Sequence, residues 1–439
     1  MIQAKCVHII GLGGIGTSAV ARYFLSLGAK VSGSDVHTGS IVEDLQKEGV
    51  EFRLGHFVEN VPRDCDLIIY SRAVPATNVE RQTASELGIA ELSYPEFLGK
   101  LAKTKKTIAV SGTNGKSTTT AMIASIMIRA GLDPTVIVGT QVPGWSEHNL
   151  RVGKGEWLVA EACEHMASFL HIQPDIAVVT NIAEDHLDYY KDLKHIQETF
   201  QKWVSGVKPG GACVRNRQDK NSMALTCMKD LSFEVLDRQL ESTGQSFTVD
   251  QKEYHLSIPG EFNAQNAGTA IVTAKYIGVS PEICAEALQD FKGTWRRFEH
   301  VGKWQEADIY SDYAHHPDGV KGTIEAFKEA FPNRRLVVVF EPHQKSRTKE
   351  LFAGFVESFD LADELIIGEI YEVEGRNEGD VVSSEDLVDA IKSRDTVKSV
   401  SYGQDYDKIE SLLRDSVKAD DIVVFMGAGT IDNLARKLV

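Results

Sequence analysis

Short apolar, β-branched runs alternate with helix-forming stretches along the whole 439-residue chain. Runs such as CVHIIG, TIAVSG and RRLVVVFEP are each followed by a stretch long enough for a helix. Strands that are joined by helical crossovers lie parallel, and the helices cover both faces of their sheet. The alternation therefore predicts an α/β protein, and a domain size of roughly 150 residues suggests about three domains.

Changes in this pattern place the predicted domains at 1–103, 104–295 and 296–439. The basic stretch Lys103–Lys106 is the expected linker between the first two domains. In the second domain, the segments EWLVAEA, DIAVVTNI and GEFNAQNAGTAIVTA are predicted to be buried strands that feed helices. In the third, RRLVVVFEP, DELIIGE, VKSVSYG and DIVVFMGAG are predicted strands separated by helices.

The charge and the cysteines exclude several classes of function. The formal net charge of −16 disfavours nucleic acid or a membrane surface as partner, because both attract basic patches. The six cysteines form no C-x-x-C pair, which indicates neither a disulfide framework nor a zinc site. The first residues lack the basic and apolar segments of a secretion signal, so a cytoplasmic protein is expected.

A first glycine turn, Gly11–Gly16 (GLGGIG), follows a predicted strand and opens a predicted helix over Ile15–Leu27. Asp35 ends the next predicted strand. Such glycines allow a tight turn and let the helix N-terminus approach a pyrophosphate. The pattern alone fits a nicotinamide dinucleotide, another nucleoside diphosphate such as a UDP-sugar, or a turn without any ligand.

A second glycine turn, Gly112–Thr118 (GTNGKST), lies between the predicted strand Thr107–Val110 and a helix that starts near Ser117. In such a loop, backbone N–H groups cradle phosphates, the lysine neutralises phosphate charge and the serine hydroxyl binds Mg²⁺. Val110 stands where the common G-x₄-G-K-S pattern has its first glycine, so the loop is a shortened variant. It predicts an ATP-binding site.

Two polar residues follow predicted strands of the second domain. Glu161 comes after WLVA, and His186 comes shortly after DIAVV. Both are expected at the carboxyl edge of the sheet, where a carboxylate suits Mg²⁺ and an imidazole is an unusual ligand. From the residues alone, a structural role for His186 is an equal alternative, as is helix capping for Asn263 and Asn266.

The two glycine turns, together with the segments EACEHMASFLHIQPDIAVVTNIAEDHLDYY, GEFNAQNAGTA, WRRFEHVG, SDYAHHP, FEPHQKSRT and MGAGTIDNLA, carry a resemblance over nearly the whole chain. In this order they resemble the Mur ligase superfamily. The resemblance implies a Rossmann-like N-terminal UDP-binding domain, a central P-loop-type ATPase domain with a mainly parallel sheet, and a C-terminal Rossmann-like domain that binds the amino acid.

The resemblance also implies the site residues. The catalytic positions are Lys116, Glu161 and His186, and the metal positions are Ser117, Glu161 and His186. The ATP contacts are Gly112, Thr113, Asn114, Gly115, Lys116, Ser117, Thr118, Asn263, Asn266, Arg297 and Asp312. The UDP-sugar contacts are Gly11, Gly13, Gly14, Ile15, Gly16, Ser34, Asp35 and Ser71. The amino-acid contacts are Tyr313, His343 and Arg347, with Arg347 on the incoming carboxylate.

Several neighbours of these positions carry separate expectations. Arg296 could be a surface cation, and His315 and His316 are expected to face solvent or phosphate. Compared with many members of the superfamily, Gln344 replaces an arginine, which Lys345 could offset.

The reaction implied by the resemblance is the ATP-dependent ligation of L-alanine to the lactyl carboxylate of UDP-N-acetylmuramate through an acyl phosphate, in cell-wall precursor synthesis. ATP and Mg²⁺ are the implied cofactors, and a monomer or a homodimer is expected. Two alternatives are a ligase that adds a recycled tripeptide to the same UDP-sugar and an NAD-dependent dehydrogenase. The dehydrogenase would leave Gly112–Thr118 without a role. A third alternative is a nucleotide-binding module without catalytic activity.

Overall fold

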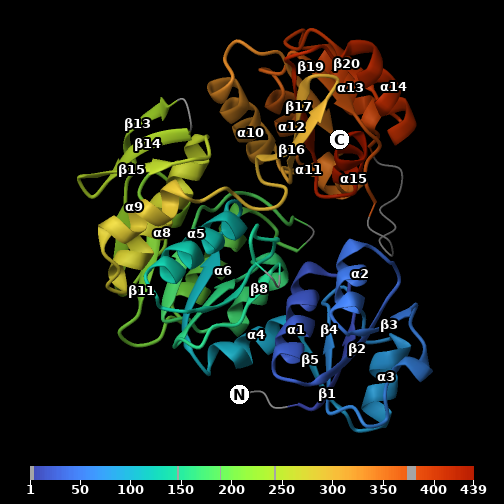
Figure 1. The fold of residues 1–439 in the computed structure, drawn as a ribbon, viewed down its shortest axis with the longest axis vertical. Coiled ribbons are helices and arrows are strands. Elements are labelled where there is room, and N and C mark those ends of the chain that lie inside the picture. The colour runs from blue at the N-terminus through green and yellow to red at the C-terminus, as the bar shows by residue number, and fades with distance from the viewer. Residues whose placement is uncertain (1–3, 146–147, 188, 242–243, 373–381) are drawn as a thin grey trace. The chain divides into compact units, whose positions relative to one another are not determined.

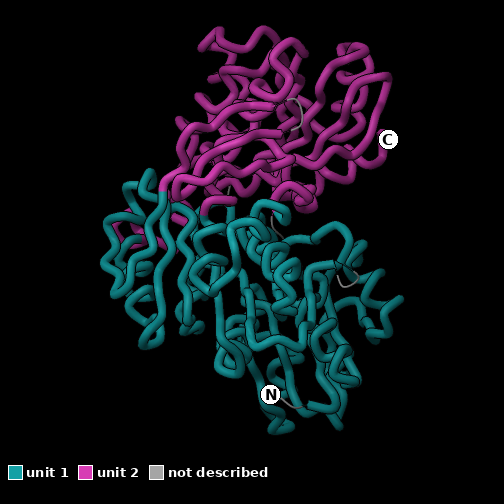
Figure 2. The backbone as a smooth tube through the Cα atoms, turned by 60° about the vertical axis from the view of Figure 1, so that its left-hand side comes forward, with its two compact units in different colours: residues 1–182, 197–233, 269–287 teal, residues 183–196, 234–268, 288–439 magenta. Residues whose placement is uncertain are grey.

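The computed structural model describes residues 4–145, 148–187, 189–241, 244–372 and 382–439. Figure 2 shows that the described chain divides into two compact units. The first unit comprises 1–182, 197–233 and 269–287, and the second comprises 183–196, 234–268 and 288–439. Among the described residues, no helix has the length and apolar character needed to span a membrane.

The first sheet consists of parallel strands in the order β3-β2-β1-β4-β5 (Figure 1). Its strands are β1 (Cys6–Ile10), β2 (Lys30–Asp35), β3 (Glu51–Leu54), β4 (Leu67–Tyr70) and β5 (Ala90–Ser93). The accompanying helices are α1 (Ile15–Ser26), α2 (Ser40–Lys47), α3 (Val79–Glu86) and α4 (Tyr94–Ala102), with a 3₁₀ turn at Val58–Asn60. The chain leaves β1 toward β2 on one side and returns to β4 on the other. The turn after β1 thus lies at the switch point where such sheets bind ligands.

The second sheet has the order β12-β11-β10-β6-β9-β7-β8 and is parallel except for the pair β7–β8. Its strands are β6 (Lys106–Ser111), β7 (Thr135–Ile137), β8 (Leu150–Arg151), β9 (Trp157–Glu161), β10 (Ile176–Val179), β11 (Ala212–Asn216) and β12 (Asp230–Phe233). Its helices are α5 (Lys116–Arg129), α6 (Leu193–Val204), α7 (Lys220–Met223), α8 (Glu261–Tyr276) and α9 (Pro281–Gln289), with a 3₁₀ segment at His165–His171. Because β6 lies between β9 and β10, the second glycine turn also occupies a switch point.

The second unit contains an antiparallel sheet and a mainly parallel one. The antiparallel sheet consists of β13 (Leu236–Glu241), β14 (Gly244–Val249) and β15 (Lys252–Leu256). The other has the order β16-β17-β21-β18-β19-β20, from β16 (Glu299–Trp304), β17 (Ala307–Asp312), β18 (Leu336–Phe340), β19 (Glu364–Ile367), β20 (Val400–Tyr402) and β21 (Ile422–Met426). Its helices are α10 (Pro317–Ala330), α11 (Lys345–Glu350), α12 (Phe352–Ser358), α13 (Ser384–Lys392), α14 (Tyr406–Ser416) and α15 (Ile431–Leu438). Only β16–β17 is antiparallel among the pairs described in this sheet.

The mainly parallel α/β architecture is confirmed, but one predicted strand is wrong. The segment GEFNAQNAGTAIVTA lies almost wholly in the helix α8. Its fully buried apolar residues include pairs three and four positions apart, which is the spacing of one helix face: Ala264, Ala267, Ala270, Ile271 and Ala274. Alanine has the highest helix propensity, so the local sequence agrees with the packing.

The linker predicted at Lys103–Lys106 is one residue shorter in the structure. Helix α4 ends at Ala102 and β6 starts at Lys106, so residues 103–105 join them. Lys105 donates a hydrogen bond to the carbonyl of Gly155 at 2.6 Å, and burial lowers the pKa of its ammonium group.

The packing of the last sheet can be tested by comparing a buried leucine with an exposed one. Leu365 on β19 is fully buried in a cluster with Val338 and Phe340, whereas Leu361, four residues earlier, is 50% exposed. Leu365→Ala should destabilise the fold by about 2–5 kcal/mol, because a buried leucine leaves a cavity. Leu361→Ala should change stability little. Urea unfolding of both variants measures the difference, and equal losses would contradict the described core.

Candidate functional site

The first glycine turn is shaped by close contacts that exclude larger residues. Gly11 has a φ of +81°, and a Cβ there would lie 2.9 Å from the Cβ of Ser71. A Cβ on Gly16 would lie 2.7 Å from the ring of Tyr94. Gly14 is the N-cap of α1 and Ile15 its first residue, and among the described residues no side chain caps this helix. Its N-terminal N–H groups therefore face the turn.

Three further predicted residues lie at the same edge of the first sheet. Asp35 ends β2 and accepts a hydrogen bond from the backbone N–H of Gly13 at 2.8 Å. The carbonyl of Ser34 accepts the N–H of Gly11 at 2.9 Å, and the N–H of Ser71 donates to Ile10 at 2.9 Å. The structure thus brings together the residues predicted for the UDP-sugar, and it uses Asp35 to hold the turn.

The second glycine turn depends on two glycines with left-handed backbone. Gly112 has a φ of +139°, and a Cβ there would lie 2.1 Å from the hydroxyl oxygen of Thr180. Gly115 has a φ of +80° and forms the N-cap of α5, which receives no side-chain cap from the described residues. The loop therefore offers a helix N-terminus of the kind that binds phosphates.

The loop is fixed by residues that follow β10. Asn181 accepts the N–H of Thr113 on its carbonyl at 3.0 Å and the N–H of Asn114 on its side chain at 2.9 Å. Thr180 donates its hydroxyl to the carbonyl of Asn114 at 2.6 Å. The hydroxyl-bearing residues of the loop are largely buried, namely Thr113, Ser117 and Thr118. The loop conformation is thus specified by the neighbouring strand.

Lys116 already has a carboxylate partner. Its ammonium group donates to Glu164 at 2.9 Å and to the carbonyls of Gly112 at 2.7 Å and Thr113 at 3.0 Å. Glu164 is 3% exposed and the Lys116 side chain is 16% exposed. Burial acts to lower the pKa of Lys116, but the charge of Glu164 outweighs it and the pKa is raised. Lys116 is therefore a fixed cation beside the phosphate loop.

Glu161 ends β9 at the same edge of the second sheet. Its carboxylate accepts the N–H of Gly139 at 2.7 Å, and a Cβ on Gly139 would approach that carboxylate to the same distance. Because β9 pairs with β6, Glu161 lies opposite Val110 in the register. Glu161 belongs to the first unit and His186 to the second.

In the second unit, Asn263 and Asn266 lie near the start of α8 and are both buried. The amide of Asn263 donates to the carbonyl of Pro259 at 2.7 Å, and its backbone N–H donates to Gly260 at 3.0 Å. The side chain of Asn263 thus fixes the start of the helix. This contact agrees with the alternative of a structural role.

Arg297 and Asp312 lie close to Tyr313. The guanidinium of Arg297 is 4.7 Å from the centre of the Tyr313 ring. Asp312 accepts the N–H groups of Phe298 and Ala314, each at 2.8 Å. Burial raises the pKa of Asp312, against the opposing influence of Arg297.

Arg296 is not a surface cation, because it is only 6% exposed. Its guanidinium donates to the carbonyl of Gly427 at 2.5 Å and lies over the ring of Tyr313 at 5.0 Å. Burial lowers its pKa.

Of the two adjacent histidines, His316 differs from the expectation of a solvent or phosphate contact. His316 is 6% exposed, and its Nε2–H donates to the carbonyl of Glu184 at 2.8 Å. Its Nδ1 accepts the N–H of Asp318 at 3.3 Å, which makes His316 the N-cap of α10. His315 lies against Tyr313, and burial holds its pKa well below the usual range. His316 is therefore structural.

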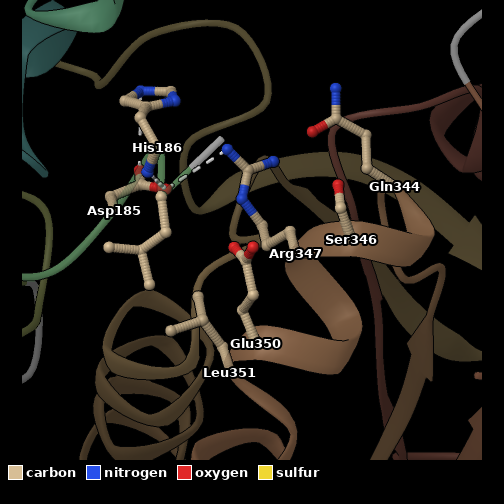
Figure 3. A pocket seen from close by; sticks show the side chains of 8 residues that line it. Asp185, His186, Gln344, Ser346, Arg347, Glu350 and Leu351 are labelled. Carbon is tan, nitrogen blue, oxygen red and sulfur yellow. Dashed lines mark hydrogen bonds and ion pairs between the residues drawn. The ribbon is translucent and has the colours of Figure 1, made fainter. Parts of the chain in front are cut away.

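Of the three predicted amino-acid residues, Arg347 lines a pocket within the second unit (Figure 3), and Tyr313 and His343 lie outside its lining. The pocket is lined by Asp185, His186, Leu187, Gln344, Ser346, Arg347, Glu350 and Leu351. Arg347 contacts His343 at 3.3 Å through one nitrogen of its guanidinium and Asp185 at 3.3 Å through another. The rings of Tyr313, His315 and His343 follow one another at centroid distances of 5.2 and 6.0 Å.

The pocket presents opposite charges side by side. Burial acts to raise the pKa of Asp185, but His186 and Arg347 outweigh it and hold that pKa well below the usual range. Arg347 and Asp185 are about one-tenth exposed. Lys345 does not replace the missing arginine at Gln344, because its ammonium pairs with Glu372 at 2.7 Å. An ionised carboxylate and a guanidinium thus line one small pocket.

Sequence reasoning missed the partners of the predicted residues: Glu164, Asn181 and Asp185. Asn181 lies two residues after DIAVV, and the carboxyl edge of a sheet is a usable signal for such a residue. Asp185 contacts Arg347 across 162 positions of sequence. No local spacing indicates a contact of that range.

Comparison with known proteins identifies relatives over the whole chain. Three family models match: "Mur ligase family, catalytic domain" at 6–106, "Mur ligase middle domain" at 110–274 and "Mur ligase, glutamate ligase domain" at 296–429. The UDP-N-acetylmuramate–L-alanine ligase of Caldanaerobacter subterraneus subsp. tengcongensis is 38% identical, with 99% of this chain and 97% of that protein covered. The enzyme of the same name from Aquifex aeolicus is 36% identical, with 100% and 98% covered.

Solved structures agree with these relatives. The UDP-N-acetylmuramate–alanine ligase of Thermotoga maritima superposes with a TM-score of 0.86 at 27% identity, covering 99% of this chain and 98% of that one. A murein peptide ligase from Psychrobacter arcticus gives a TM-score of 0.72 at 22% identity, with the same coverage, and supports the fold alone.

The pair of Lys116 and Glu164 leads to a stability prediction. Lys116→Ala should destabilise the first unit by about 3 kcal/mol, because the buried carboxylate loses its ammonium group. The double variant Lys116→Met/Glu164→Gln should recover most of that loss, because both charges are absent. Thermal unfolding of the two variants tests this. A double variant less stable than Lys116→Ala would show that the carboxylate has a separate structural role.

Proposed function

This chain belongs to the Mur ligase family, and from that premise we propose that it joins L-alanine to the lactyl carboxylate of UDP-N-acetylmuramate in a reaction driven by ATP. The observation that carries the proposal is 38% identity to a ligase of that name over 99% of the chain. Residues 1–103 take the UDP-sugar, residues 104–295 provide most of the ATP contacts, and residues 296–439 take the amino acid together with Asp185. The reaction takes place in the cytoplasm.

The two glycine turns divide the phosphate-bearing substrates between them. The turn at Gly11–Gly16 binds the diphosphate of the UDP-sugar on the N-terminus of α1, next to Ser34, Asp35 and Ser71. The turn at Gly112–Thr118 binds the phosphates of ATP, with Lys116 as counter-charge. This division is supported by the position of each turn at a switch point of its own sheet.

The remaining ATP contacts come from the second unit. Asn263 and Asn266 offer amides that suit an adenine edge, although Asn263 also bonds the chain before α8. Arg297 supplies a cation, and Asp312 holds the backbone at Phe298 close to it.

Mg²⁺ is the metal that accompanies ATP in this proposal. The buried hydroxyl of Ser117 and the carboxylate of Glu161 are hard oxygen donors and fit this ion. The imidazole of His186 completes the proposed set. When bound, the ion neutralises charge on the phosphates.

The pocket around Arg347 has the charges that a zwitterionic amino acid requires. Arg347 binds the carboxylate of alanine and Asp185 binds its ammonium group, since these two side chains lie 3.3 Å apart in the same pocket. His343 contacts Arg347, and the ring of Tyr313 lies against that of His315, so both stand behind the lining of the pocket and add no full charge to it.

A carboxylate is a poor acylating agent, so in the proposed reaction ATP activates it first. An oxygen of the lactyl carboxylate attacks the γ-phosphorus, the bond from that phosphorus to the bridging oxygen breaks, and ADP leaves. The ammonium group of alanine first loses a proton to solvent, and the resulting amine attacks the acyl carbon. The bond between that carbon and the phosphate oxygen breaks, and the second amine proton passes to solvent as phosphate leaves. Lys116 stabilises negative charge on the phosphoryl group during the transfer, and the fixed loop positions it.

Release of phosphate tests the whole proposal. The purified chain should release phosphate only when ATP, Mg²⁺, UDP-N-acetylmuramate and L-alanine are all present. The folded double variant Lys116→Met/Glu164→Gln should form no ADP, because the counter-charge of the phosphate loop is lost. Phosphate release that depends on a tripeptide and not on alanine would favour the recycling reaction. Normal turnover by the double variant would remove Lys116 from the mechanism.

The pocket makes a separate prediction about alanine. Arg347→Ala should raise the KM for alanine by roughly tenfold to a hundredfold, because a charge-assisted contact is lost. The KM values for ATP and the UDP-sugar should stay near those of the parent enzyme. Lys349→Ala is the control, since Lys349 is an exposed cation on the same helix. Equal rises in all three KM values would assign Arg347 to another task.

A further inference from the structure

A buried carboxylate organises the edge of the first sheet. Glu80, in the first turn of α3, has no exposed surface. Its Oε2 accepts the hydroxyl of Ser34 at 2.5 Å and the Nε2–H of His8 at 3.3 Å. Its Oε1 accepts the amide of Asn60 at 2.6 Å and the backbone N–H of Phe57 at 3.2 Å. A buried acid with this many donors is held in place and ionised.

The charge of Glu80 is consistent with these contacts. Burial acts to raise the pKa of Glu80, but the hydrogen bonds from His8, Ser34 and Asn60 outweigh it and the pKa is lowered. Glu80 lies outside both glycine turns and has no role in the reaction proposed above. Its donors come from β1, from β2 and from the segment after β3.

The contacts of Glu80 fix the orientation and the tautomer of His56. The Ser34 hydroxyl gives its single proton to Glu80, so its oxygen can only accept from Nδ1 of His56, which lies 3.0 Å away. The same Nδ1 is 3.5 Å from Oε1 of Glu80. The hydrogen on Nδ1 leaves Nε2 of the neutral ring as an acceptor. The side chain of His56 is 20% exposed, and no described residue bonds its Nε2.

His56 lies beside the first glycine turn. The carbonyl of Ser34 accepts the N–H groups of Gly11 at 2.9 Å and Leu12 at 3.0 Å, while its hydroxyl contacts His56. The N–H of Gly55 donates to the carbonyl of Asp35 at 2.7 Å. The segment that carries His56 is therefore bonded to the same strand end as the turn.

The immediate surroundings of His56 favour a nucleoside over a phosphate. The next residue, Phe57, is 56% exposed, and Leu54 is 57% exposed. Exposed apolar side chains at a ligand-binding edge suit the face of a base. The nearby negative charge of Glu80 disfavours a second anion at Nε2.

We propose that His56 binds the nucleoside of the UDP-sugar through Nε2, which accepts a hydrogen bond from the uracil N–H or a ribose hydroxyl, and that Glu80 positions His56. The inference rests on the proposed function, in which the first sheet takes the UDP-sugar. His56 is thus a binding residue, and Glu80 is a positioning residue that acts through Ser34 and His56. The diphosphate remains on the glycine turn.

The test measures binding of UDP and of uridine, which has no phosphate, by calorimetry and competition. His56→Leu should raise the Kd for both by the same factor, roughly tenfold, because one hydrogen bond to the nucleoside is lost. Glu80→Gln should act in the same direction. The double variant should bind no more weakly than the weaker single variant, because the two residues act as one unit. The KM for ATP should not change.

The matched control is His255→Leu, because His255 also pairs with a glutamate, Glu241 at 3.0 Å, but at the surface of β15. It should bind UDP as the parent does. Parent-like binding by His56→Leu, or a loss confined to UDP, would overturn the inference. Losses that multiply in the double variant would overturn the role of Glu80. If Glu80→Gln does not fold, His56→Leu alone decides. A parent chain that binds neither UDP nor uridine would instead overturn the proposed function.

Discussion

A buried parallel strand must have its backbone N–H and C=O groups paired with neighbours on both sides, and this requirement arranges the molecule. Crossover helices bring each strand back in the same direction, so all carboxyl ends of a parallel sheet emerge at one edge. The two glycine turns follow β1 and β6, which are central strands of their sheets. The neighbouring strands bring three residues to the turns at their carboxyl ends: Ser34, Ser71 and Asn181. Their contacts with the turns therefore follow from the pairing of the strands.

Internal counter-charges are the second recurring feature. Lys116 is held by Glu164, and Arg347 is held by Asp185. Each pair keeps a cation fixed where an anionic group of a substrate is proposed to bind. Such fixed charges cost little reorganisation during a reaction, which is the physical basis of electrostatic catalysis. Glu80 acts in the same manner on neutral donors, because it orders Ser34 and Asn60.

The parts of the fold that the sequence predicts are those set by local patterns. Strand β6, the turn at Gly112 and the start of α5 all lie within a few residues of one another. Position 112 requires glycine because the side chain of Thr180 lies too close for a Cβ. The apolar run at the end of GEFNAQNAGTAIVTA favours a strand, whereas the spacing of its buried alanines favours the helix α8 that the structure contains. The burial of Arg296, which bonds Gly427, depends on a contact across 131 positions. Long-range contacts of this kind leave no mark on local spacing.

If ligation passes through an acyl phosphate, one oxygen of the lactyl carboxylate must leave with the released phosphate. UDP-N-acetylmuramate is labelled with a heavy oxygen isotope in its lactyl carboxylate and turned over with ATP and L-alanine. Mass spectrometry of the released phosphate then measures the label. We expect one labelled oxygen in each phosphate, because the carboxylate oxygen that attacks the γ-phosphorus departs with it. Amide product accompanied by unlabelled phosphate would exclude the acyl phosphate.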